Sequence, residues 1–290
     1  MLSYILLNYN DNETTQKCVD KIKDYTIIEH IIIVDNMSTD DSYYRLKKLQ
    51  SSKVDVIKTD KNGGYGYGNN FGIRYAKKKY NSELVVISNP DVFIDEYCVV
   101  RCVEFITKKE DCSIVSLLMQ NLDGSYNYKC VWKLPTYWQY LFFSSLLGSN
   151  INFNYDEKNF EKEYFVCDCV AGSWLMAKTN DLINMGLYDE NVFLYCEETI
   201  LAHRAKKLNY KTYVLPKGKF LHMHSVSISK TFKSDITQQR LMWKSRLYVL
   251  DTYYRSSRVQ KIIGHVFAKY ALLERRLINF VRLIKRSVGK

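Results

Sequence analysis

The sequence predicts an α/β protein with a mostly parallel sheet flanked by helices and a basic helical extension at its C-terminal end. Over the first 227 residues, short apolar runs alternate with segments whose apolar residues recur at helical spacing. Residues 228–290 differ, because they contain 15 Lys and Arg but only 3 Asp and Glu. We therefore expect one folded domain over residues 1–227 and a basic amphipathic helical tail over residues 228–290.

Four apolar runs in the first ninety residues predict buried strands. They cover residues 3–7, 30–34, 54–59 and 84–87. Between the first two, Cys18, Val19 and Ile22 share one side of a predicted helix, which Asp11 or Asn12 can cap. Strand, helix and strand form a βαβ unit, so these strands are expected to be parallel.

Polar residues follow the first two strands, beginning at Asn8 and at Asp35. Open α/β sheets bind ligands at the carboxyl ends of their strands. Asp35 can therefore contribute to a binding site, although an Asp at a strand end is equally a turn former.

A glycine-rich stretch over residues 62–72 follows the third strand, and a helix is expected to begin inside it and to run through Tyr80. The spacing of Gly64, Gly66 and Gly68 does not match the G-x-G-x-x-G pattern of dinucleotide-binding folds, which follows a first strand. We interpret the glycines as letting backbone amides approach a phosphate or sugar. A flexible surface loop is the alternative.

The fourth strand ends in Asn89-Pro90-Asp91. Pro90 has no N–H group with which to continue the ladder, so Asp91 is expected to project from the carboxyl end of the strand. One or two protein oxygens, completed by a diphosphate, are enough to hold a divalent cation. Asp91 fits this role, and His222 is a candidate second ligand that suits manganese better than magnesium. A core histidine is the alternative for His222.

The middle of the chain is less regular. The pattern predicts a helix over residues 95–109, a strand over 113–118, two short apolar segments over 165–178 and a helix over 181–185. A further helix is expected to run through Lys207 and to end near Asn209, followed by strands over 211–215 and 219–222. Residues 119–165 show no clean periodicity and are interpreted as irregular core.

Glu197 and Glu198 are adjacent at the expected start of a helix, directly after apolar residues. Apolar neighbours raise the pKa of a carboxyl toward neutrality, which suits a general base. The alternative is that both residues only interact favourably with the helix dipole. The pattern leaves both interpretations open.

The eight cysteines mostly lie in apolar patterns, which favours reduced thiols over disulfides. The chain begins with an apolar run that has no basic leader, so a first strand is expected there and not a signal peptide. No apolar run is long enough for a membrane-spanning helix.

Several ordered motifs over about residues 1–227 resemble those of family 2 inverting glycosyltransferases with the GT-A (Rossmann-like) fold. The resemblance is to bacterial rhamnosyltransferase-like enzymes of capsule, O-antigen and cell-wall polysaccharide synthesis. The motifs are residues 5–10, Val34-Asp35-Asn36-Met37-Ser38, residues 62–72, Asn89-Pro90-Asp91, Ala171-Gly172-Ser173, Phe193-Leu194-Tyr195-Cys196-Glu197-Glu198 with Arg204, and His222 with Ser227.

The resemblance implies a role for each motif. Asp91 and His222 correspond to the metal site, which takes Mn²⁺ or Mg²⁺. Glu198 stands where the family has its catalytic Asp, so either Glu198 or Glu197 is expected to be the base, and Ile200 stands where the family often has another Asp. Nucleotide or donor binding is implied for Asn8, Tyr9, Asp35, Asn36, Asn62, Gly63, Gly64, Asn69, Asn89 and Arg204.

The implied activity is inverting transfer of a sugar from a nucleoside-diphosphate donor, such as dTDP-rhamnose or a UDP-hexose, to a saccharide or lipid-linked acceptor. The sequence does not fix the sugar or the acceptor. A non-catalytic GT-A-like module that binds a nucleotide or sugar, or acts as a scaffold, is the alternative. A nucleotidyltransferase would need a basic phosphate-binding signature, and residues 8–11 carry no positive charge.

The tail combines Lys and Arg with apolar residues in helical runs. This composition is typical of a helix on a membrane surface, and it agrees with a peripheral location at the cytoplasmic face of the cell membrane. Packing on the domain or a homodimer contact is the second interpretation. Nucleic acid is not favoured, because no nucleic-acid motif accompanies the charge.

Overall fold

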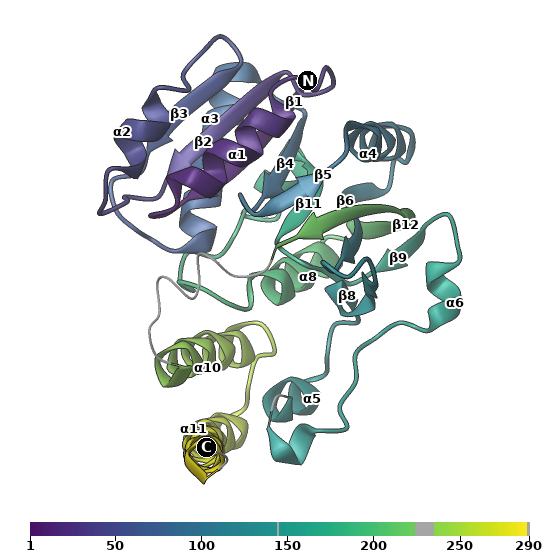
Figure 1. Cartoon of the computed structure of the whole chain (residues 1–290). Helices are drawn as coiled ribbons and strands as arrows, with labels where there is room; N and C mark the ends of the chain where they lie inside the picture. Colours follow the sequence, from purple (N-terminus) through teal and green to yellow (C-terminus); the bar gives the residue numbers. More distant parts are fainter. Residues whose placement is uncertain (144, 224–234, 289–290) are drawn as a thin grey trace. The chain divides into compact units, whose positions relative to one another are not determined.

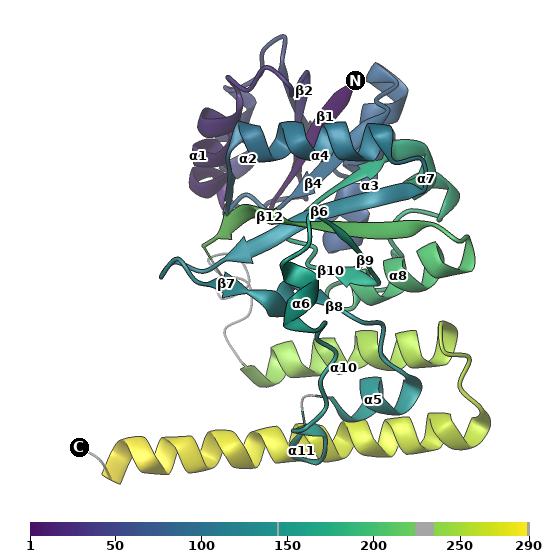
Figure 2. The ribbon, with the colours of Figure 1, turned by 90° about the vertical axis from the view of Figure 1, so that its right-hand side faces the viewer.

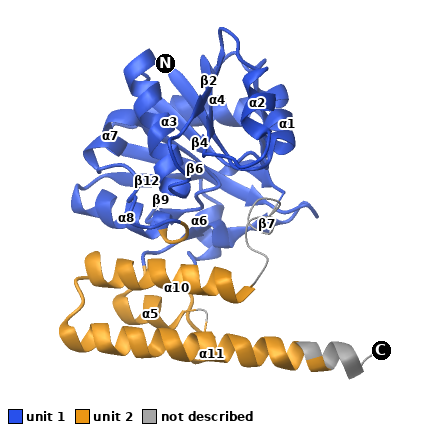
Figure 3. Cartoon of the chain, turned by 90° about the vertical axis from the view of Figure 1, so that its left-hand side faces the viewer, with its two compact units in different colours: residues 1–134, 154–193, 197–228 blue, residues 135–153, 194–196, 229–290 orange. Residues whose placement is uncertain are grey.

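The computed structural model describes residues 1–143, 145–223 and 235–288. The chain divides into two compact units (Figure 3). Unit 1 comprises residues 1–134, 154–193 and 197–228, and unit 2 comprises residues 135–153, 194–196 and 229–290. The boundary expected after residue 227 lies outside the described residues. Unit 2 also contains residues 135–153 and 194–196, which the sequence had not assigned to the helical tail.

Unit 1 is built on a sheet whose first four strands are parallel, as the sequence predicted (Figure 1). Their spatial order is β3 (Val54–Lys58), β2 (His30–Asp35), β1 (Leu2–Asn8) and β4 (Leu84–Ser88). The chain therefore moves outward from β1 to β3 and then returns to the other side of β1. Such a reversal of strand order creates a crevice at the carboxyl ends of the strands.

The sheet continues past β4 with strands of mixed direction. β11 (Trp174–Lys178) is antiparallel to both β4 and β6 (Cys112–Gln120), β12 (Lys211–His222) runs parallel to β6, and β5 (Val92–Ile94) closes the edge antiparallel to β12. The smaller strands are β7 (Tyr126–Asn127), β9 (Phe165–Cys167) and the pair β8 (Val131–Trp132) and β10 (Cys169–Val170).

Two separate strands had been expected over residues 211–222, but the structure has one, β12. Its pairing with β6 shifts register between Leu215 and Lys219. Pro216 lies in this interval and has no N–H to donate. The proline therefore coincides with an irregularity in the strand and does not end it.

Helices cover both faces of the sheet (Figure 1). α1 (Asn12–Ile22) and α2 (Ser42–Lys47) lie on one face, and α3 (Tyr65–Tyr80) lies on the other. Among the described residues, the remaining α-helices of unit 1 are α4 (Glu96–Lys108), α6 (Glu157–Phe160), α7 (Thr179–Asn184) and α8 (Glu197–Lys207). No helix among the described residues has the length and apolar character that crossing a bilayer requires.

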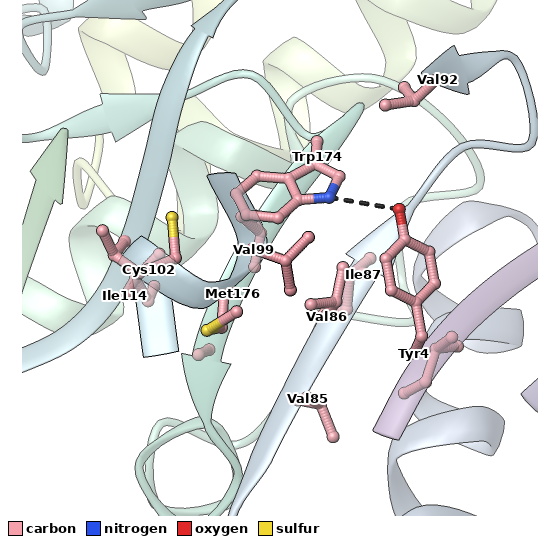
Figure 4. Close-up of a cluster of buried hydrophobic side chains, with 14 of the residues drawn as sticks. Tyr4, Val85, Val86, Ile87, Val92, Val99, Cys102, Ile114, Trp174 and Met176 are labelled. Atoms are coloured by element: carbon pink, nitrogen blue, oxygen red, sulfur yellow. Dashed lines mark hydrogen bonds between the residues drawn. The ribbon is translucent and has the colours of Figure 1, made fainter. Parts of the chain in front are cut away.

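The core of unit 1 fixes β11 beside β4 (Figure 4). Trp174 is fully buried and pairs in register with Ser88 at the end of β4. Its indole Nε1 donates a hydrogen bond to the Tyr4 hydroxyl at 3.2 Å, which satisfies the polar atom of a buried side chain. Gly172 and Ser173, which directly precede Trp174, are thereby positioned at the carboxyl end of β4.

The glycines at the start of α3 are explained by close packing. A Cβ atom at Gly68 would lie 2.2 Å from Leu7 Cδ1, and one at Gly72 would lie 2.6 Å from Ile5 Cγ2. At Gly64, where φ is +91°, a Cβ atom would lie 2.0 Å from the carbonyl oxygen of Phe193. Close packing therefore gives these glycines a structural role, and the approach of a phosphate or sugar to the segment stays a prediction.

Unit 2 is helical, as predicted for the C-terminal extension (Figure 2). It contains α5 (Tyr137–Phe142), α10 (Asp235–Thr252) and the long α11 (Arg258–Val288). Arg275 of α11 pairs with Asp235 of α10 at 2.8 Å, and this contact lowers the pKa of Asp235 to about 2. Phe267 of α11 contacts Trp243 of α10 and Phe142 of α5. α10 and α11 thus form a helical hairpin that also packs on α5.

Substituting Gly64 with Ala tests the packing explanation. The variant should lose about 3 kcal/mol or more of unfolding free energy, because a positive φ and a clash with a backbone oxygen act together. Gly124→Ala is the matched control, since Gly124 also has a positive φ of +84° but open space around it. Its loss should be about 1 kcal/mol in urea unfolding. Equal losses would mean that the close approach to Phe193 is unimportant.

Candidate functional site

Asn8 and Asp35 lie side by side at the carboxyl ends of β1 and β2, and both are fully buried. Asn8 Nδ2 donates to Asp35 Oδ2 at 3.0 Å, and the backbone N–H of Ser38 donates to Asp35 Oδ1 at 3.0 Å. Both oxygens of the Asp35 carboxylate therefore accept hydrogen bonds from the protein. In this arrangement Asp35 holds the loop that follows β2 at the sheet edge.

Asn36 connects the same edge to the glycine-rich segment. Its Nδ2 donates to Asn62 Oδ1 at 3.2 Å and to the carbonyl of Gly64 at 3.0 Å. Asn69, on α3, is also buried, and its Nδ2 donates to the carbonyl of Tyr65. Asn69 Oδ1 has no hydrogen-bond partner among the described residues. The predicted donor-binding residues Asn36, Asn62 and Gly64 are thus brought together.

Asp91 and His222 are brought together by the pairing of β5 with β12. His222 Nε2 lies 3.1 Å from Asp91 Oδ1, and the backbone N–H of Met223 donates to the Asp91 carbonyl at 3.0 Å. Both side chains are largely buried. Ser227, the other residue of this predicted motif, lies outside the described residues.

Asp91 and His222 form a candidate cation site. In the described parts of the chain, no group of three or more His, Cys, Asp or Glu side chains is arranged to hold a metal ion. A carboxylate beside an imidazole nevertheless fits a divalent cation that takes its remaining ligands from a diphosphate and water. The residues present therefore fit an open site with two protein ligands, Asp91 and His222.

Glu198, in the first turn of α8, contacts the segment that leads into β11. Its Oε1 accepts a hydrogen bond from the backbone N–H of Gly172 at 3.2 Å. The side chain lines a small, mostly apolar pocket with Tyr188 and Leu201. Burial raises the pKa of the Glu198 carboxyl above its ordinary value. Glu197 is buried beside it on the same turn.

Backbone contacts connect Glu198 with the Asp91 turn. Gly172 is followed by Ser173, whose carbonyl accepts a hydrogen bond from the N–H of Asn89 at 2.9 Å. Asn89 lies two residues before Asp91. Glu198 and the turn containing Asp91 therefore lie on either side of the Gly172-Ser173 backbone, at the carboxyl end of β4.

Tyr65 and Tyr188 belong to this site but were not singled out from the sequence. The Tyr65 hydroxyl donates to the carbonyl of Gly172 at 2.6 Å, so both polar groups of Gly172 are hydrogen-bonded to the protein. Tyr188 packs edge-on against Tyr65, with ring centroids 5.8 Å apart. In the sequence, their position was the only indication that they belong to the site. Tyr65 directly follows Gly64, and Tyr188 directly precedes Asp189.

Arg204 supports a loop in the described conformation. Its Nη1 donates to the carbonyls of Gly186 at 2.9 Å and Leu187 at 2.6 Å, and Nη2 lies 3.4 Å from Asp189. Leu187 has a positive φ of 59°, which is unusual for a branched side chain. Arg204 thus stabilises the turn before α8, and its contact with a donor stays a prediction.

Comparison with known proteins identifies the family. A sequence model described as "Glycosyl transferase family 2" matches residues 3–179. The chain belongs to glycosyl transferase family 2. The motif-based prediction of this family is therefore confirmed.

Two characterised members are similar in sequence. The low-salt glycan biosynthesis hexosyltransferase Agl10 of Haloferax volcanii is 29% identical over 210 residues, which cover 72% of this chain and 62% of that protein. The rhamnosyltransferase WbbL of Escherichia coli is 22% identical over 209 residues, which cover 66% of this chain and 76% of that protein. This chain therefore matches less than two thirds of the length of the hexosyltransferase.

Solved structures confirm the GT-A fold. GalNAc-T7, solved with UDP, GalNAc and Mn²⁺, superimposes with a TM-score of 0.61 at 12% identity and covers 92% of this chain and 54% of its own. The mannosyltransferase PcManGT of Pyrobaculum calidifontis, solved with GDP-Man and Mn²⁺, gives a TM-score of 0.57 at 15% identity and covers 93% of this chain and 69% of its own.

The raised pKa of Glu198 predicts a pH-dependent stability difference. Below the ordinary pKa of 4.5, the carboxyl is protonated in both the folded and the unfolded chain, so burial carries no ionisation cost. As the pH rises above that value, the unfolded chain ionises more readily, and the folded state of the wild type becomes less stable. Glu198→Gln removes this cost and keeps an acceptor for the Gly172 N–H.

The Tm of Glu198→Gln should therefore exceed that of the wild type by about 2 °C or more at pH 8, and the difference should vanish near pH 4. Thermal unfolding followed by circular dichroism across this range measures it. Glu104→Gln, at an exposed position of α4, is the control and should show no such divergence. A wild type that is more stable than Glu198→Gln at pH 8 would contradict the raised pKa.

Proposed function

We propose that this family 2 protein transfers a sugar from a nucleoside-diphosphate donor to a hydroxyl group of a saccharide or lipid-linked acceptor, with inversion at the anomeric carbon. The main support is that Glu198 and the turn containing Asp91 both contact one backbone segment, Gly172-Ser173. A partly buried carboxyl suited to a base and a carboxylate suited to a cation thus border the same sheet edge. The similar hexosyltransferase and rhamnosyltransferase support a hexose or rhamnose donor.

Glu198 would act as the general base. Its carboxylate takes the proton of the acceptor hydroxyl, the acceptor oxygen bonds to the anomeric carbon, and the bond from that carbon to the diphosphate oxygen breaks. A single displacement from the opposite face inverts the configuration. A pKa above the ordinary glutamate value brings the base closer to the operating pH, where proton transfer is more favourable.

The leaving diphosphate needs compensation of its charge. Asp91 and His222 would hold Mn²⁺ or Mg²⁺, and such an ion neutralises charge on the diphosphate. The nucleotide would bind along the carboxyl ends of β1, β2 and β4. The residues proposed to line it are Asn8, Tyr9, Asp35, Asn36, Asn62, Gly63, Gly64, Asn69 and Asn89.

The second candidate is a non-catalytic nucleotide-sugar-binding or scaffold protein. Two substitutions favour it: Glu198 stands in place of the family's Asp, and Ile200 stands where another Asp is common. Ile200 is buried in α8, so its apolar side chain forms part of the core there. A scaffold would release no nucleoside diphosphate from any donor.

Glu198→Gln tests the assignment of the base. Transfer should fall about 100-fold to 10,000-fold, because the acceptor proton loses its recipient, while donor binding persists. The measurement is release of nucleoside diphosphate, with donor binding followed by thermal shift. Glu197→Gln, one residue away on the same turn, is the matched control and should retain most activity. The reverse pattern would assign the base to Glu197, and full activity of both variants would overturn the mechanism.

Asp91→Asn tests the cation site. The amide preserves size but removes the charge that attracts a divalent ion, so the Mn²⁺ concentration for half-maximal transfer should rise at least about tenfold. His222→Gln should have a smaller effect, since it leaves the negative charge of Asp91 in place. EDTA should abolish wild-type transfer, and added Mn²⁺ should restore it. Activity that persists in EDTA would contradict a role for the metal.

A further inference from the structure

α11 carries two separate apolar faces. The inner face contains Phe267, Ala268 and Ala271, which are buried within unit 2. Phe267 contacts Trp243 of α10 and Phe142 of α5, so this face is used for folding. α10 likewise turns Trp243, Val249 and Leu250 inward.

The second face is an outer stripe, which we define as six apolar residues that are each 55% to 65% exposed. They are Val259, Ile262, Val266, Leu273, Leu277 and Phe280. Their separations of three, four or seven residues place them along one side of a helix, and the half-exposed Tyr270 lies in the largest interval. The outer stripe is about 30 Å long at the helical rise of 1.5 Å per residue. Monomeric soluble proteins rarely expose a continuous apolar surface of this length.

The charges exposed on α11 are positive. Arg258, Lys261, Lys269, Arg276 and Arg282 are all exposed. The only acidic residue of the helix, Glu274, is buried and accepts a hydrogen bond from the backbone N–H of Leu146 at 3.0 Å. The outer stripe is therefore accompanied by basic side chains with no exposed acidic residue on the same helix.

We propose that the outer stripe of α11 binds the surface of an anionic lipid bilayer, with the helix lying in the plane of the interface. Apolar side chains insert among the upper acyl chains, while basic side chains contact acidic headgroups. Charge complementarity favours this occupant over a second copy of the chain. Two outer stripes packed together would bring two basic helices into contact without exposed acidic partners. The proposal assigns binding to one face of α11 and does not depend on the proposed catalytic activity.

Vesicle flotation with the 290-residue chain tests this. The wild type should float with vesicles of phosphatidylcholine and phosphatidylglycerol but not with phosphatidylcholine alone, and high salt should weaken binding. The triple variant Leu273→Gln, Leu277→Gln and Phe280→Gln should lose at least about tenfold in vesicle affinity, because insertion is removed while the folded contacts remain. A wild type that fails to bind anionic vesicles would overturn the proposal.

A matched control changes large side chains of unit 1 that are even more exposed. Tyr44→Gln, Tyr97→Gln and Leu122→Gln change side chains that are 69% to 72% exposed, and they should leave flotation unchanged. Circular dichroism of both triple variants checks that the fold is retained. Light scattering gives the oligomeric state without lipid. The membrane proposal would be rejected if the wild type is a dimer, the α11 variant is a monomer, and both bind vesicles equally. The outer stripe would then be assigned to contact with a second copy of the chain.

Discussion

The candidate site depends on the backbone of Gly172-Ser173. The Gly172 N–H is bound by Glu198, its carbonyl is bound by Tyr65, and the Ser173 carbonyl binds the N–H of Asn89. Each partner comes from a different element: α8, the start of α3, and the turn after β4. Buried backbone groups need partners, so these three hydrogen bonds both stabilise the fold and fix where Glu198 and the Asp91 turn meet.

The sequence predicted the parts of the site that follow from local pattern. Strand ends located Asn8, Asp35 and Asp91, since apolar runs stop just before them and parallel strands present their carboxyl ends to one edge. The sequence could not predict the contact between Glu198 and Gly172, which are 26 residues apart in the chain. It also could not predict that Gly64 packs against Phe193, because this contact requires the complete tertiary structure.

Some residues for which the sequence predicts a ligand contact also make contacts within the protein, and the ligand contact itself stays a prediction. A glycine-rich segment before a helix fits a phosphate site, but the same composition allows a helix to approach a sheet closely, as Gly68 and Gly72 do. Arg204 is basic and follows a catalytic motif, yet its guanidinium binds the carbonyls of Gly186 and Leu187. Composition does not distinguish a ligand contact from an internal contact with the same chemistry.

Unit 2 includes the three residues that directly precede α8. Residues 194–196 belong to this unit, and the Ser245 hydroxyl of α10 donates to the Leu194 carbonyl at 2.7 Å. Tyr195 and Cys196 both have positive φ, near 73° and 74°, a conformation that costs of order 1–3 kcal/mol for non-glycine residues and persists only where surrounding contacts impose it. Residues 194–196, whose backbone these contacts within unit 2 support, directly precede Glu197 in the chain.

The charge of the site argues for a cation in the proposed reaction. The polar residues at the ends of β1, β2 and β4 are mainly amides and carboxylates, among them Asn8, Asp35, Asn89 and Asp91. Arg204, the only basic residue among the predicted donor contacts, is engaged by its own loop. A diphosphate next to Asp91 would therefore face like charge without compensation from the predicted side chains. A divalent ion held by Asp91 and His222 would convert that repulsion into attraction, and this is the physical argument for the proposed cation site.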